Sequence, residues 1–134
     1  MTVVAGYIPT PEGLAAVDYG IEMARQHETR LVVVNTGHHG NNAHPNFATA
    51  ADIDALDARL RNLDLEHEVR QATGGRSAAD EILATASELK AELIVIGIRR
   101  RTPVGKLLTG STAQQILLDA ECAVLAVKAP LAGG

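Results

Sequence analysis

Short apolar runs alternate with segments of helical spacing along this chain, and that alternation constrains its fold more than any other feature. The runs predict five strands, at residues 3–7, 31–34, 65–71, 93–98 and 123–127. Between them, apolar residues recur every three or four positions, as at Leu14, Val17 and Ile21, which predicts four helices. This alternation favours parallel strands, because each helix serves as the crossover between two of them.

The charge pattern of the strands predicts their order in the sheet. The run at 65–71 alternates apolar residues with Glu66, Glu68 and Arg70, which is typical of an edge strand. The runs at 3–7 and 93–98 carry no charge, so we expect them near the centre. With right-handed crossovers and helices on both faces, we predict a doubly wound, Rossmann-like α/β fold. Its five parallel strands would have the order 3-2-1-4-5 in a single domain over residues 1–134.

The predicted winding of the sheet reverses between the first and fourth strands. Ligands of doubly wound sheets bind beyond the carboxyl ends of the strands at such a reversal. The residues expected there are 8–10, after the first strand, and the segment that begins at Gly97, after the fourth.

That segment gathers basic residues and ends at a helix. Within eight positions lie four of the chain's twelve Lys and Arg residues: Arg99, Arg100, Arg101 and Lys106. A residue without a Cβ, Gly97, would let a ligand approach the backbone. The next helix opens with two hydroxyl residues, where unpaired N–H groups and the helix dipole favour an anion. We predict a phosphate-binding site made of Gly97, Arg99, Arg100, Gly110, Ser111 and Thr112; a charge run is also typical of a solvated loop.

Two common phosphate motifs do not fit this chain. The P-loop requires Gly-Lys followed by Ser or Thr, whereas Gly105-Lys106 is followed by Leu107. The dinucleotide fingerprint should follow the first strand, but Gly6 and Gly13 lie seven residues apart there.

Composition and charge argue against several classes of function. The formal net charge of −4 does not favour binding to nucleic acid or to an anionic membrane. One cysteine, Cys122, excludes an internal disulfide and a Cys-based zinc site. The apolar runs are too short to span a membrane, and the first residues lack the basic region of a secretory signal. We therefore expect a cytoplasmic protein.

The histidines and hydroxyl groups do not indicate catalysis or a metal centre. The predicted loop after the second strand, residues 35–46, holds His38, His39 and His44, whose spacing matches no familiar zinc motif. No base and orienting acid accompany Ser111 in a recognisable context. His27 and His67 are expected at the surface, and Cys122 as an inert core residue. We predict no catalytic residue and no metal ligand.

The spacing of the basic segment resembles a known family. Gly97 is followed by two residues, position 100, nine residues and then Gly110-Ser111. This resembles the nucleotide loop of the universal stress protein family, Gly-x2-Gly-x9-Gly-(Ser/Thr), with identity at three of the four marked positions. The Thr10-Pro11-Glu12 helix start and the ending at residues 118–128 are also similar to that family.

The resemblance implies a five-stranded parallel fold, homodimers joined through the last strand, and ATP or AMP binding in one subgroup. It also implies a role in stress survival and regulation without a defined reaction. Three positions depart from the family pattern. Arg100 replaces the second loop glycine and would offer phosphate a bidentate guanidinium. Ile8 replaces an Asp suited to hydrogen bonding at adenine, and Ala123 replaces a Pro.

The last strand, residues 123–127 (Ala123 to Val127), would form an uncharged apolar edge of the sheet. Such an edge invites pairing with another chain, so we expect a homodimer in which this strand meets its twin. Coverage by a loop or by the C-terminal tail is the alternative.

Three functions stay open on this sequence. The first is a non-catalytic stress protein that binds ATP or AMP. The second is an interaction protein of the same fold whose pocket is degenerate, as Ile8 and Arg100 suggest. The third is a weak ATPase or phosphotransferase, which would require a base that the sequence does not identify.

Overall fold

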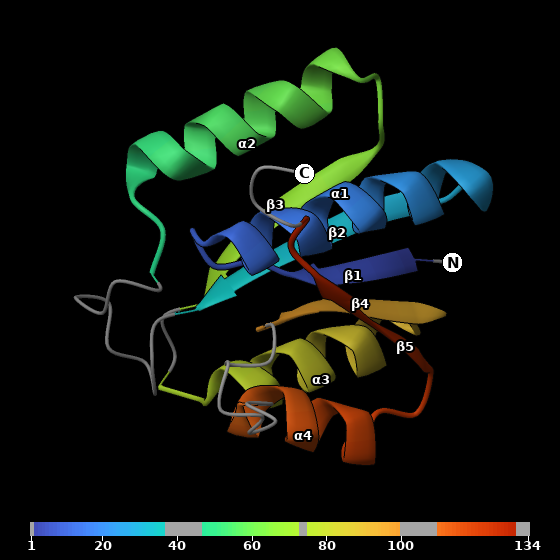
Figure 1. Cartoon of the computed structure of the whole chain (residues 1–134). Coiled ribbons are helices and arrows are strands. Elements are labelled where there is room, and N and C mark those ends of the chain that lie inside the picture. The colour runs from blue at the N-terminus through green and yellow to red at the C-terminus, as the bar shows by residue number, and fades with distance from the viewer. Residues whose placement is uncertain (1, 37–46, 73–74, 100–109, 131–134) are drawn as a thin grey trace.

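A parallel five-stranded sheet lies between two pairs of helices (Figure 1). The computed structural model describes residues 2–36, 47–72, 75–99 and 110–130. The strands are β1 (Thr2–Gly6), β2 (Arg30–Thr36), β3 (His67–Ala72), β4 (Leu93–Ile98) and β5 (Ala123–Lys128). The helices are α1 (Pro11–Gln26), α2 (Ala50–Asn62), α3 (Ala78–Leu89) and α4 (Ser111–Asp119). The strand order is β3-β2-β1-β4-β5, which confirms the predicted α/β class and the order 3-2-1-4-5.

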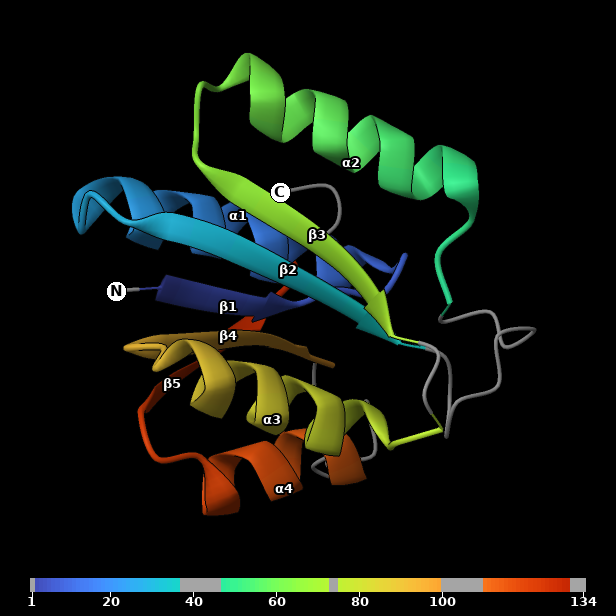
Figure 2. The same cartoon turned by 180° about the vertical axis from the view of Figure 1, so that it is seen from behind.

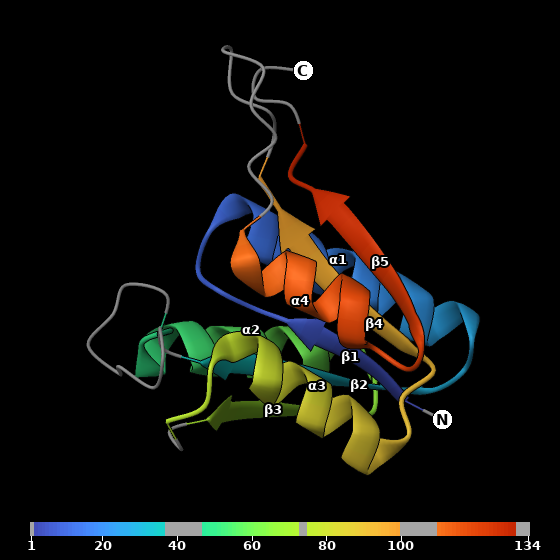
Figure 3. The ribbon, with the colours of Figure 1, turned by 90° about the horizontal axis from the view of Figure 1, so that it is seen from below.

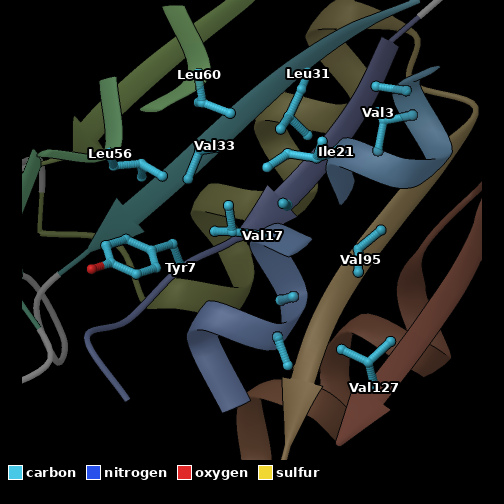
Figure 4. Packing of buried hydrophobic residues seen from close by; sticks show 14 of the residues in the cluster. Val3, Tyr7, Val17, Ile21, Leu31, Val33, Leu56, Leu60, Val95 and Val127 are labelled. Carbon is cyan, nitrogen blue, oxygen red and sulfur yellow. The ribbon is translucent and has the colours of Figure 1, made fainter. Parts of the chain in front are cut away.

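Successive side chains of the central strands point to opposite faces and build two separate cores. On one face, α1 and α2 pack against residues such as Val3 and Leu31 (Figure 4). On the other face, α3 and α4 pack against residues such as Val4 and Val32, and they lie side by side when the molecule is seen from behind (Figure 2). Burial on both faces explains why these strands read as continuous apolar runs.

Side chains at the ends of the loops cap three of the helices. Thr10 Oγ1 accepts a hydrogen bond from the Gly13 amide at 3.1 Å, and Ser77 Oγ accepts one from Asp80 at 3.1 Å. The first of these agrees with the Thr10-Pro11-Glu12 helix start in the sequence. Thr49 and Asp52 form a reciprocal capping box at the start of α2. The cap of α4, Gly110, makes no side-chain hydrogen bond, so the backbone at this helix start is left without such a partner.

The prediction that His67 lies at the surface is wrong. Its side chain is only 12% exposed, because α2 covers the start of β3. The ring Nδ1 lies 2.7 Å from the Leu65 carbonyl oxygen and Nε2 lies 2.8 Å from the Asp57 carboxylate. Both partners are hydrogen-bond acceptors.

This contact helps to hold α2 in place, together with the ion pair between Arg59 of α2 and Asp18 of α1. In α2, the buried side chains are Leu56 and Leu60. Asp57 joins that helix to β3 through His67 and also accepts a hydrogen bond from Arg61. Hydrogen bonds from Arg61 and then from His67 lower the pKa of the Asp57 carboxyl. An ionised Asp57 is therefore part of the folded state.

We predict that Asp57→Asn lowers the free energy of unfolding at pH 7 and that this loss shrinks in acid. A carboxyl whose pKa is lowered by folding stabilises the fold above its unfolded pKa, and this contribution disappears as the pH falls through its folded pKa. Urea denaturation of wild type and variant at pH 7 and near pH 3 measures the difference. Asp54→Asn, an exposed site on the same helix, is the matched control. Equal losses for the two variants at pH 7 would contradict the assignment.

Candidate functional site

A pocket lies at the carboxyl ends of β1 and β4, where the sheet reverses its winding. β1 pairs with β2 on one side and with β4 on the other, so the following loops leave in opposite directions. The pocket has a volume of about 250 Å³ and is lined by residues of both strand ends and of the first turns of α3 and α4. This is the location that the topology predicts for a ligand.

The structure brings together five of the six predicted site residues. The lining of the pocket includes Gly97, Arg99, Gly110, Ser111 and Thr112. The sixth, Arg100, lies outside the described residues, as do Arg101 and Lys106. Ile8, which departs from the family pattern, also lines the pocket.

One wall of the pocket suits an anion. It is formed by the first residues of α4, Gly110 to Thr112, together with Arg99. A helix start carries unpaired N–H groups and the positive end of the helix dipole. The first turn of α3 adds a second helix start, from Ser77 to Ala79. Among the described residues Arg99 forms no ion pair, and its side chain is exposed. The guanidinium is therefore available to a ligand.

The floor of the pocket is apolar. A Cβ placed on Gly6 would lie 2.8 Å from Ile82 Cδ1 and 3.7 Å from Ile96 Cγ2, so these three residues are in contact. Val34 and Ala79 extend the same surface. A ligand with a flat apolar part and an anionic part would match the two surfaces.

Gly97 was expected to let a ligand approach the backbone, but the structure gives a different reason for a glycine at this position. A Cβ at this position would lie 2.1 Å from the Glu12 carbonyl oxygen, far inside van der Waals contact. The absent side chain thus lets the start of α1 pack against the end of β4, and the contact is made by protein backbone. At Gly110, by contrast, a Cβ would meet nothing within 4 Å, and φ of −62° is open to any residue.

A buried amide network ties together the strand ends beside the pocket, and the sequence analysis missed it by placing Asn35 in a loop. Asn35 belongs to β2, which ends at Thr36, and it is fully buried. Its amide nitrogen donates to the Tyr7 carbonyl oxygen at 2.8 Å, and its oxygen accepts from the Ala48 amide at 2.9 Å and from Gln71 Nε2 at 3.1 Å. The carboxyl ends of β1, β2 and β3 are held together by this one side chain.

The described residues show no arrangement for metal or thiol chemistry at this site. Within the described ranges, no three His, Cys, Asp or Glu residues lie close enough to hold a metal ion; His38, His39 and His44 lie outside those ranges. Burial raises the pKa of the Cys122 thiol, which stands in a different hollow of the molecule. Among the helices that the structure describes, none is both long enough and apolar enough to cross a membrane.

Comparison with known proteins points to one family. The model of the universal stress protein family matches residues 1–128. A universal stress protein of Mycolicibacterium smegmatis is 42% identical over 126 residues, which cover 94% of this chain and 96% of that protein.

Solved structures share the fold. A universal stress protein from Archaeoglobus fulgidus superposes with a TM-score of 0.77 at 27% identity, covering 96% of this chain and 98% of that one. A structure from the same organism, in complex with dAMP, gives a TM-score of 0.65 at 24% identity, covering 96% of this chain and 98% of that one.

We predict that the same substitution has opposite consequences at the two glycines of the site. Gly97→Ser should lower the free energy of unfolding by at least about 2 kcal/mol, because its Cβ would overlap backbone atoms. Gly110→Ser should change it by no more than a few tenths of a kcal/mol, because serine is accepted at a helix cap. Urea denaturation measures both. Comparable losses at the two positions would refute the different roles assigned to them.

Proposed function

The chain belongs to the universal stress protein family, and from that premise we propose that it is a non-catalytic stress-response protein that binds an adenine nucleotide, ATP or AMP. The nucleotide would occupy the pocket at the carboxyl ends of β1 and β4. The observation that carries this proposal is the meeting of a helix start, Arg99 and an apolar floor in one pocket. The dAMP held by a structural neighbour supports the choice of adenine as the base.

The two surfaces of the pocket suggest how the ligand would lie. Its phosphate would face Arg99 and the amides and hydroxyls of Ser111 and Thr112. Its base would lie on the apolar floor beside Ile82 and Ile96. Arg100, which lies outside the described residues, would add a second guanidinium to the phosphate.

In this proposal the protein binds the nucleotide and does not hydrolyse it. The lining residues that the structure describes include one carboxylate, Glu12, and neither histidine nor cysteine. A hydrolase would need a base placed to activate water. We therefore propose a regulatory role in the cytoplasm, in which the bound nucleotide itself is the signal.

Ile8 favours a second candidate, an interaction protein with a degenerate pocket. Its side chain cannot accept a hydrogen bond from the base, and it lines the pocket. In that case the pocket would stay empty of nucleotide at cellular concentrations, and the function would depend on protein partners alone.

We predict that wild-type protein binds AMP and ATP, and that Arg99→Gln and Ser111→Ala each weaken binding about tenfold, the size expected for loss of a charge-assisted hydrogen bond. Isothermal titration calorimetry measures this. Arg25→Gln removes the same charge from an exposed position near the end of α1 and should leave the affinity unchanged. No heat with wild type at millimolar nucleotide would exclude the first candidate and leave the second.

We also propose a homodimer joined through β5. This strand lies at the edge of the sheet opposite β3 (Figure 3). Its first residue, Ala123, is exposed, and the next three side chains are only half-buried. Leu118, in the helix that leads into the strand, is 83% exposed. An apolar edge with unpaired backbone groups favours antiparallel pairing with a second copy.

We predict that the wild type sediments at about twice the mass of the 14.1 kDa chain, whereas Ala123→Lys and Leu118→Lys shift it toward the monomer. A lysine at the pairing edge would face its own copy across a symmetric interface. Ala55→Lys, at an exposed site on α2, is the control and should stay dimeric. A wild type that sediments as a monomer at high concentration would overturn the proposed dimer.

A further inference from the structure

Glu12 is an acidic residue that lines a pocket otherwise suited to an anion. It occupies the first turn of α1 and lines the pocket with Gly97 and Arg99. Its position is fixed by backbone packing, since a Cβ on Gly97 would lie 2.1 Å from the Glu12 carbonyl oxygen and 3.1 Å from its Cβ. The backbone of Glu12 is therefore fixed at the place where the start of α1 meets the end of β4.

The opposite charges in this pocket do not neutralise each other. The ion pairs formed by the described residues involve neither Glu12 nor Arg99, and no hydrogen bond of the Glu12 side chain is present among those residues. An acidic residue in a first turn also favours the helix dipole, but that role requires no pocket. Two unpaired charges on one pocket suit a ligand that carries an anion and a hydrogen-bond donor.

The proposed ligand class has both groups at neighbouring positions. In a nucleoside phosphate, the phosphate is joined to a sugar whose hydroxyl groups donate hydrogen bonds. A carboxylate repels the phosphate and has no donor of its own, so it can bind only the donors of the ligand. With the phosphate at the α4 start and the base on the Ile82–Ile96 floor, the sugar would lie between them.

Resting on the proposed function, we propose that Glu12 determines the specificity of the site by accepting a hydrogen bond from a ribose hydroxyl of the bound nucleotide. The pocket then selects ribonucleotides over their deoxy analogues. In dinucleotide-binding folds, an acidic side chain about 20 residues beyond the first βα turn binds the ribose. In this chain the residue comes instead from the first turn of α1.

The test compares AMP with 2′-deoxy-AMP and 3′-deoxy-AMP by calorimetry, on wild type, Glu12→Ala and Glu12→Gln. We expect wild type to bind AMP about tenfold more tightly than at least one deoxy analogue, as loss of a hydrogen bond to a charged group implies. Glu12→Ala should lose this preference, binding AMP about as weakly as that analogue. Glu12→Gln, which keeps an oxygen acceptor without the charge, should fall between them. Glu22→Gln, an exposed glutamate of the same helix, is the control and should match wild type.

The outcomes separate the two proposals. If wild type binds no nucleotide, the proposed function fails and the inference fails with it. If wild type binds AMP but Glu12→Ala weakens all three ligands equally, Glu12 does not bind a ribose hydroxyl, and the inference alone is overturned. If Glu12→Ala binds AMP more tightly than wild type does, the carboxylate acts by repelling phosphate, which also overturns it.

Discussion

Parallel pairing of the strands is the constraint on which the rest of this structure depends. Each of β1, β3 and β4 runs toward the same edge of the sheet and is followed by a helix that begins there. The starts of α1, α3 and α4 consequently supply residues to one pocket. The backbone N–H groups of those starts give the edge a positive potential before any side chain is considered. The pocket lies at this edge, at the point where the loops after β1 and β4 leave in opposite directions.

Close backbone packing turns that edge into a fixed wall. Two glycines let the start of α1 approach the sheet: a Cβ on Gly13 would lie 1.9 Å from the Ile8 carbonyl oxygen, and one on Gly97 would lie 2.1 Å from that of Glu12. The buried amide of Asn35 also bonds to Tyr7, which lines the pocket, and to Ala48. A pocket with walls held in this way changes little when a ligand enters, so less binding energy is lost in ordering the protein.

The sequence predicts the fold because the fold depends on local patterns. Apolar runs, helix caps such as Thr10 and Ser77, and the charged strand at the sheet edge each act over a few residues and agree with one another. The location of the pocket follows from the strand order, and the family resemblance follows from the spacing of Gly97 and Gly110-Ser111. Other features depend on side chains that meet only after folding. No local pattern shows that Asp57 will cover His67, that Asn35 will bridge three strand ends, or that the Cβ missing from Gly97 makes room for a helix.

The most direct test of the central claim is a nuclear magnetic resonance titration of uniformly ¹⁵N-labelled protein with AMP. If the pocket at the carboxyl ends of β1 and β4 is a nucleotide site, the amide signals of Arg99 and of residues 110–113 should shift in a saturable manner, with smaller shifts at residues 77–79. Amides near the amino ends of the strands, such as those of Lys90 and Cys122 before β4 and β5, should stay unchanged. Saturable shifts near the amino ends of the strands, with none at residues 110–113, would contradict the assignment of the site.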